Sequence, residues 1–106
     1  MIVAPLSILG VWEEEFQKFA AFPYALAVLS GSSAKKLDTL RHMIGTALQV
    51  VVVNYESAWR LEKALTAWHP DLIIADEGHK IKTHNIAASK AMHRMGREAS
   101  YRLLLT

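Results

Sequence analysis

Four consecutive valines, Val50–Val53, stand inside an apolar run that extends from Gln49 to Asn54. A strand with one solvated face alternates apolar and polar residues, whereas an unbroken β-branched run predicts a strand covered on both faces. Leu72–Ala75 is a second run of this kind. Strands buried on both faces are typical of parallel sheets with helices on either side, so these two runs constrain the fold more than any other feature.

Five strand-type runs alternate with helical patterns along the chain. The predicted strands are residues 2–5, 24–29, 49–54, 72–75 and 101–105. The predicted helices begin at Ser7, Ser33, Ser57 and Asn85, and their apolar stripes are Leu9, Trp12, Phe16 and Phe19; Leu37, Leu40 and Ile44, ending at Gly45; Leu61, Ala64, Leu65 and Trp68; and Ala88, Ala91, Met92, Met95 and Ala99. This alternation predicts right-handed crossovers and an α/β fold, a three-layer, doubly wound parallel sheet of five strands.

Composition sets bounds on the class of protein. A chain of 106 residues forms one domain at most, and 52% hydrophobic residues supply a core that a disordered chain would lack. The net charge of +2 only weakly favours anionic partners. Cysteine is absent, which excludes disulfides and thiolate zinc sites and fits an intracellular protein. We expect neither a membrane span nor a signal peptide, and the histidines lack the spacing of a zinc site.

Parallel strands bring their carboxyl ends to one edge of the sheet, where the chemistry of such folds gathers. Polar clusters follow the predicted strands at Pro5–Ser7, Ser30–Ser32, Asn54–Glu56 and Asp76–His79, and Thr106 follows the last strand. The sequence therefore predicts a functional site at this edge.

Asp76 and Glu77 are neighbouring carboxylates directly after the apolar strand 72–75. Their mutual repulsion would be relieved by a cation, and Mg²⁺ prefers oxygen ligands together with several waters. In P-loop nucleotide hydrolases an aspartate in this setting holds the magnesium of the nucleotide, and a neighbouring glutamate can orient or deprotonate the attacking water. The dipeptide alone is also typical of residues that cap a helix or solvate a loop.

The wider sequence resembles one family at four places. DEGHKIK (76–82) resembles motif II of the SNF2/Swi2 group of superfamily 2 helicase-like ATPases, commonly written D-E-A/G-H-R/K-x-K. VAPLSILGVWEEEF (3–16) is similar to their motif Ia, and VVVNYES (51–57) to the motif Ib region. YRLLLT (101–106) resembles the strand that enters motif III. The four elements stand in the family's order and cover almost the whole chain.

This resemblance implies that residues 1–106 are part of the first RecA-like lobe of an ATP hydrolase that uses Mg²⁺ and ATP. Asp76 would bind Mg²⁺ through water and Glu77 would activate water. His79 would couple the nucleotide site to motif III or to a second RecA-like lobe, although a solvated loop residue is the alternative. Lys80 and Lys82 match the family's basic positions after motif II, or are surface charges.

The resemblance also implies a nucleic-acid track, with duplex DNA as the expected partner. Pro5, Leu6 and Ser7 would line it, because N–H groups and a hydroxyl at a helix start suit a phosphate oxygen. Asn54 and Tyr55 would meet the tracking strand, although Asn54 departs from the usual threonine. Trp12 matches a family tryptophan, yet its spacing with Phe16 predicts a core position.

Two parts of the family's machinery are not found in the sequence. The phosphate-binding loop G-x-x-x-x-G-K-[ST] is expected upstream of motif Ia, and its nearest imitation, Ser30–Lys36, fails because Ala34 precedes the lysine and no Ser or Thr follows it. The second lobe is the other missing part. We therefore expect the chain alone to be inactive and to hold no tightly bound nucleotide.

The family also implies that the P-loop strand lies beside the motif III strand. The five strands would then be contiguous in the order 2-1-3-4-5, a RecA-like lobe lacking its P-loop strand. Residues 101–105 would form an exposed apolar edge, which invites an edge-strand dimer.

Two other classes of protein share part of this pattern. A DEAH-type superfamily 2 helicase shares the two carboxylates, but PLSILGVW and the lysines after His79 favour SNF2. A free-standing flavodoxin-like module would need a phosphate loop, for which Ser30–Ser33 is only a faint candidate. A receiver domain would need acidic residues after the first strand and an aspartate where Asn54 stands.

Overall fold

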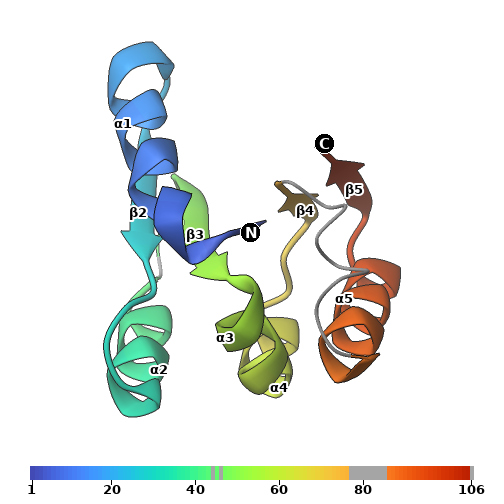
Figure 1. The fold of residues 1–106 in the computed structure, drawn as a ribbon. Coiled ribbons are helices and arrows are strands. Elements are labelled where there is room, and N and C mark those ends of the chain that lie inside the picture. The colour runs from blue at the N-terminus through green and yellow to red at the C-terminus, as the bar shows by residue number, and fades with distance from the viewer. Residues whose placement is uncertain (44, 46, 77–85, 106) are drawn as a thin grey trace.

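A computed structural model describes residues 1–43, 45, 47–76 and 86–105. All the strand pairs are parallel. The five strands are β1 (Ile2–Ala4), β2 (Tyr24–Val28), β3 (Leu48–Asn54), β4 (Leu72–Ala75) and β5 (Tyr101–Leu104). They form one sheet in the order β2-β3-β1-β4-β5 (Figure 1). The predicted α/β class and parallel sheet are confirmed.

Helices connect successive strands. They are the 3₁₀-helix η1 (Leu6–Ile8), α1 (Leu9–Phe19), α2 (Ser33–Arg41), α3 (Tyr55–Arg60), α4 (Glu62–Ala67) and α5 (Ile86–Glu98). In the part of the chain that the structure describes, no helix is long and apolar enough to cross a membrane.

The predicted strand order, 2-1-3-4-5, is wrong, because β3 lies between β2 and β1. The hydrophobic pattern could not reveal this, since either order covers both faces of β1 and β3. Connection length was equally uninformative, because the β1–β2 and β2–β3 connections, 5–23 and 29–47, are equally long. The observed order also departs from the flavodoxin-like order 2-1-3-4-5, which removes support from that alternative.

The strand order determines which face each helix covers. The chain runs from β1 to β2 in one direction across the sheet, and from β2 to β3, β4 and β5 in the other. Right-handed crossovers therefore place α1 on one face and α2–α5 on the opposite face. Figure 1 shows this arrangement, with α1 on one side of the strands and the other helices on the other.

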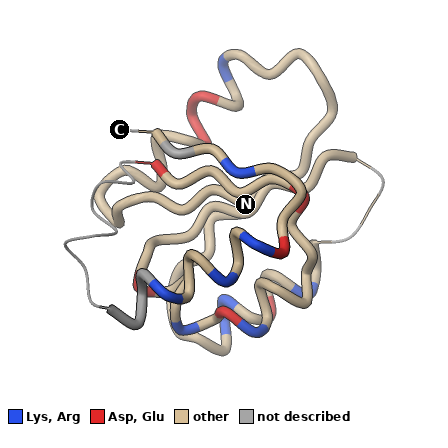
Figure 2. Tube along the Cα trace, turned by 90° about the vertical axis from the view of Figure 1, so that its right-hand side faces the viewer, with Lys and Arg blue, Asp and Glu red and all other residues tan. Residues whose placement is uncertain are grey.

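The two apolar clusters of the core correspond to these two faces. Val51 and Val53 contribute to the cluster under α2–α5, and Val50 and Val52 to the cluster under α1. All four valines are at most 5% exposed, so the predicted two-sided burial of this strand is confirmed. Charged residues lie mainly on helices and loops, whereas the strands are almost free of them (Figure 2).

β5 lies at the edge of the sheet and pairs only with β4. The register pairs Leu72 with Tyr101 and Ile74 with Leu103, so these side chains share the α1 face. Leu72, Tyr101 and Leu103 are 41%, 71% and 48% exposed. The predicted exposed apolar edge is confirmed, and the α1 face over β4 and β5 is open as well. Self-association through this edge stays a prediction.

Helix starts differ from the predicted ones. Ser7 lies inside η1 and caps no helix, and the hydroxyl that caps α2 belongs to Ser32 rather than Ser33, accepting from the Lys35 N–H at 3.2 Å. The single helix predicted from Ser57 begins two residues earlier, at Tyr55, and is divided at Leu61 into α3 and α4. The second helix ends at Arg41, before Gly45, and Ile44 lies outside the described residues.

Candidate functional site

The ends of β3, β1 and β4 meet at one edge of the sheet. The register places Ala4 opposite Asn54 and Val3 opposite Ala75. The residues that follow these strands are therefore neighbours, which brings the expected nucleic-acid positions beside Asp76, the first of the two acidic residues.

Among the described residues, three hydrogen bonds hold Asp76 at this edge. Its N–H donates to the Val3 carbonyl at 2.8 Å, which extends the β1–β4 ladder by one residue. Its own carbonyl accepts from the Tyr55 hydroxyl at 2.7 Å. Its carboxylate Oδ2 accepts from the Trp12 indole Nε1–H at 2.9 Å. Both the main chain and the side chain of Asp76 are thus fixed by other elements of the fold.

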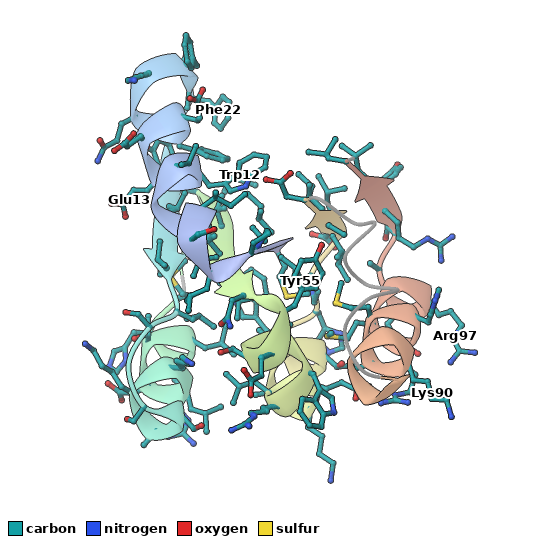
Figure 3. All side chains as sticks on the ribbon, in the orientation of Figure 1. Trp12, Glu13, Phe22, Tyr55, Lys90 and Arg97 are labelled. Carbon is teal, nitrogen blue, oxygen red and sulfur yellow. The ribbon has the colours of Figure 1, made fainter. Side chains whose placement is uncertain are left out.

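Tyr55 and Trp12 approach Asp76 from opposite faces of the sheet. Tyr55 belongs to the cluster under α2–α5, whereas Trp12 packs against the cluster under α1. Figure 3 labels both side chains, Trp12 beside the ribbon of α1 and Tyr55 at the start of α3.

The expectation that Tyr55 contacts nucleic acid does not fit its position. Its side chain is only 3% exposed and its hydroxyl is turned inward to Asp76. An aromatic ring after the four valines could be expected to pack, but the sequence did not indicate its hydroxyl partner.

The role of Trp12 was only partly predicted. Its ring packs against the core beside Phe16, as the helical spacing indicated. Its N–H, however, reaches a carboxylate 64 residues away in the chain. A half-buried tryptophan generally needs an acceptor for this N–H, and that general rule was the only signal available.

Four of the predicted site residues lie outside the described part of the chain: Glu77, His79, Lys80 and Lys82. Among the described residues, no group of three or more His, Cys, Asp or Glu side chains could hold a metal ion. No described residue donates a hydrogen bond to Asp76 Oδ1, while Oδ2 is occupied by Trp12. A carboxylate that the described residues bond at only one of its two oxygens is a chemically suitable partner for the water shell of Mg²⁺.

The proposed track residues after β1 lie on the surface. Leu6 is 72% exposed, Ser7 is exposed, and Pro5 is half-buried. The Pro5 carbonyl accepts from the Ile8 N–H at 3.0 Å, which folds the segment into η1. Asn54 is half-buried at the end of β3.

A hollow of about 440 Å³ lies beside these residues at the same edge. Leu6 and Asn54 line it together with Lys36, Ser57 and Arg60. The remaining lining residues are Leu9, Leu29, Ser30, Gly31, Ser32, Ser33, Glu56 and Leu61. The hollow therefore lies between the start of α2, the first turns of α3 and η1.

Two basic residues of this hollow were not recognised from the sequence. Lys36 donates from Nζ to the hydroxyl of the buried Ser57 at 2.7 Å. Arg60 pairs with Glu56 at 2.8 Å, but both side chains are well exposed, at 61% and 59%. Such a pair adds little stability, so Arg60 remains able to exchange its partner for another anion.

A larger hollow of about 550 Å³ lies elsewhere, along α5 and the start of β5. It is lined largely by basic side chains: Lys90, His93, Arg94, Arg97 and Arg102. None of its lining residues stands at a carboxyl end of a strand, so it is separate from the site around Asp76.

The five-stranded parallel sheet with acidic and polar strand ends defines a RecA-like α/β lobe. The chain belongs to the SNF2-related domain family, whose model matches residues 1–106. The resemblance inferred from the four motifs is thereby confirmed.

Relatives of known class align with the whole of this chain. It is 31% identical over 106 residues to the ISWI chromatin-remodeling complex ATPase CHR11 of Arabidopsis thaliana. It is 33% identical over 107 residues to the probable ATP-dependent DNA helicase CHR23 of the same plant, and 31% identical over 109 residues to the ATP-dependent helicase fft1 of Schizosaccharomyces pombe. The chain spans only 10%, 10% and 11% of these proteins.

A solved structure supports the fold. The chain superposes with a TM-score of 0.69 on a nuclease-deletion mutant of the Type ISP restriction-modification enzyme LlaGI in complex with a DNA substrate mimic. The match covers 99% of this chain and 11% of that one, at 17% identity.

We predict that Tyr55→Phe destabilises the lobe by about 1 kcal/mol, because it removes one intramolecular hydrogen bond while keeping the ring. The measurement is the free energy of unfolding in urea. Tyr24→Phe is the matched control, because Tyr24 is half-buried and its ring packs at a tilt against that of Phe16. Equal stability of the Tyr55 variant and the wild type would show that the Asp76 carbonyl does not depend on this hydroxyl.

Proposed function

We propose that this chain is part of the first RecA-like lobe of a nucleic-acid-dependent ATPase of the SNF2 type, which translocates on DNA. The observation that carries the proposal is the position of Asp76. This chain belongs to the SNF2-related domain family. Asp76, the first acidic residue of DEGH, directly follows the interior strand β4 and is held beside the end of β1.

In this proposal Asp76 holds Mg²⁺ through water, and Glu77 orients or deprotonates the attacking water. The bound Mg²⁺ supplies charge neutralisation on the phosphates of ATP. His79 relays the state of the nucleotide site to motif III or to the second lobe. The Asp76 carboxylate supports this assignment, because Trp12 bonds its Oδ2 and no described residue donates to its Oδ1.

The free edge of β5 and the uncovered α1 face beside it support a position for the P-loop strand and its connection. A strand placed on the free edge of β5 and followed by β1 would cross the sheet in the same direction as the β1–β2 connection. Its right-handed crossover would then lie on the α1 face. That face is uncovered over β4 and β5, where Leu72 and Leu103 are exposed. The chain alone, without that loop and without the second lobe, is proposed to be inactive.

The proposed DNA track runs over η1 and the hollow beside it. Pro5, Leu6 and Ser7 offer main-chain groups and a hydroxyl, and Asn54 adds an amide. Lys36 and Arg60 add positive charge from α2 and α3, and Lys80 and Lys82 would extend it. Contacts of this kind bind phosphate without reading sequence and weaken as salt increases.

We predict that Glu77→Gln in the full-length protein lowers kcat for ATP hydrolysis by about 10²- to 10⁴-fold, the contribution of a general base. The amide keeps the shape of the side chain but cannot accept the proton of water. The measurement is DNA-stimulated phosphate release at saturating Mg²⁺.

Glu98→Gln is the control, because Glu98 is an exposed residue in the last turn of α5 and should leave hydrolysis unchanged. Unaltered hydrolysis in the Glu77 variant would remove the assignment. Turnover by the 106-residue chain alone, lost on Glu77→Gln, would equally contradict the proposed need for a separate P-loop.

We predict that Lys36→Gln and Arg60→Gln each reduce the slope of log affinity for duplex DNA against log salt by about 1 in the full-length protein. Each substitution removes one phosphate contact. The measurement is fluorescence anisotropy with a labelled duplex at several salt concentrations.

Lys18→Gln serves as the control, since Lys18 is exposed in the last turn of α1 and does not line the hollow. Equal salt slopes for the Lys36, Arg60 and Lys18 variants would place the track elsewhere on the lobe.

A further inference from the structure

Trp12 lies at the junction between the core and the site edge. Its ring packs against the apolar cluster under α1, and its indole N–H points to the carboxylate of Asp76 (Figure 3). The Nε1–Oδ2 distance of 2.9 Å is that of a good N–H···O hydrogen bond. Trp12 is thus the side chain of α1 that reaches the end of β4.

Packing alone does not require this bond. A phenylalanine at position 12 would fill a similar apolar space without an N–H that needs an acceptor. The acceptor here is an anionic group, and hydrogen bonds to charged acceptors are stronger than those between neutral groups. The bond therefore restrains the carboxylate as well as satisfying the indole.

The strand geometry explains why the two side chains can meet. Ile74 packs against the cluster under α1, and side chains alternate along β4, so Asp76 also faces α1. The main chain of Asp76 is already fixed by Val3 on one side and by Tyr55 on the other. The remaining freedom of this residue is rotation of its carboxylate, and Trp12 restricts that rotation.

We propose that Trp12 is a positioning residue for the metal site, which holds Oδ2 of Asp76 so that Oδ1 is presented to the water shell of Mg²⁺. The inference rests on the proposed function of Asp76. Groups that bond to a metal-binding carboxylate or histidine orient it, and their loss generally weakens metal binding. Trp12 touches neither nucleotide nor metal in this assignment, and acts only through Asp76.

The test uses the full-length protein with Trp12→Phe, which keeps an aromatic ring in the core but has no N–H. We expect Mn²⁺ binding in the presence of ADP, followed by electron paramagnetic resonance, to weaken about tenfold. The Mg²⁺ concentration that gives half-maximal turnover should rise to the same extent, while kcat at saturating Mg²⁺ stays within about twofold. A purely structural role would instead lower the folded fraction and leave the metal affinity of the remaining protein unchanged.

Trp68→Phe is the matched control, because Trp68 packs against the opposite cluster and should leave Mn²⁺ affinity unchanged. A second variant replaces Trp12 by 3-benzothienylalanine, in which sulfur stands in place of the indole N–H. It keeps the shape of tryptophan and should reproduce the tenfold loss even if Trp12→Phe folds poorly.

Asp76→Asn separates failure of the inference from failure of the proposed function. If Asp76→Asn weakens Mn²⁺ binding but neither Trp12 replacement does, the positioning role is overturned and the metal role of Asp76 stands. If Asp76→Asn itself leaves Mn²⁺ binding unchanged, the proposed function of this site fails, and the inference fails with it.

Discussion

β1 lies between β3 and β4, and its residues Ile2, Val3 and Ala4 are at most 3% exposed. Strands covered on both faces can place polar groups only at their ends, because no side chain along them meets water. This burial places the site at the strand ends: Asn54 ends β3, and Pro5 and Asp76 follow β1 and β4, whose register is fixed by the ladder. The acidic residue then takes its last contacts from Tyr55 and Trp12, one from each face.

Local pattern sufficed for much of this fold. The valine run of β3 and the short apolar run of β4 were predicted from unbroken apolar residues, whereas the exposed edge at β5 was predicted from the resemblance to the SNF2 family. Strand order could not be derived in this way, because exchanging β1 and β3 buries the same side chains and needs connections of the same length. The hydrogen-bond ladders distinguish the two arrangements, because β3 pairs with both β2 and β1.

The site was predictable in its location and less so in its contacts. The position of Asp76 follows from the end of β4, whereas its bond to Trp12 joins residues 64 apart and depends on where α1 crosses the sheet. Lys36 and Ser57, 21 residues apart in the chain, likewise meet because α2 and α3 cover the same face of the sheet. Tyr55 was expected to contact nucleic acid because of the resemblance to motif Ib, yet its ring at the first residue of α3 turns into the core.

The central proposal is that Asp76 binds, through water, the magnesium of a bound nucleotide. A structure of the full-length protein with ADP, beryllium fluoride and Mg²⁺ tests it most directly. The account predicts that the Asp76 carboxylate lies about 4 Å from the metal, with one Mg²⁺-bound water between them. A metal held on a different strand end, with Asp76 outside its water shell, would contradict the account.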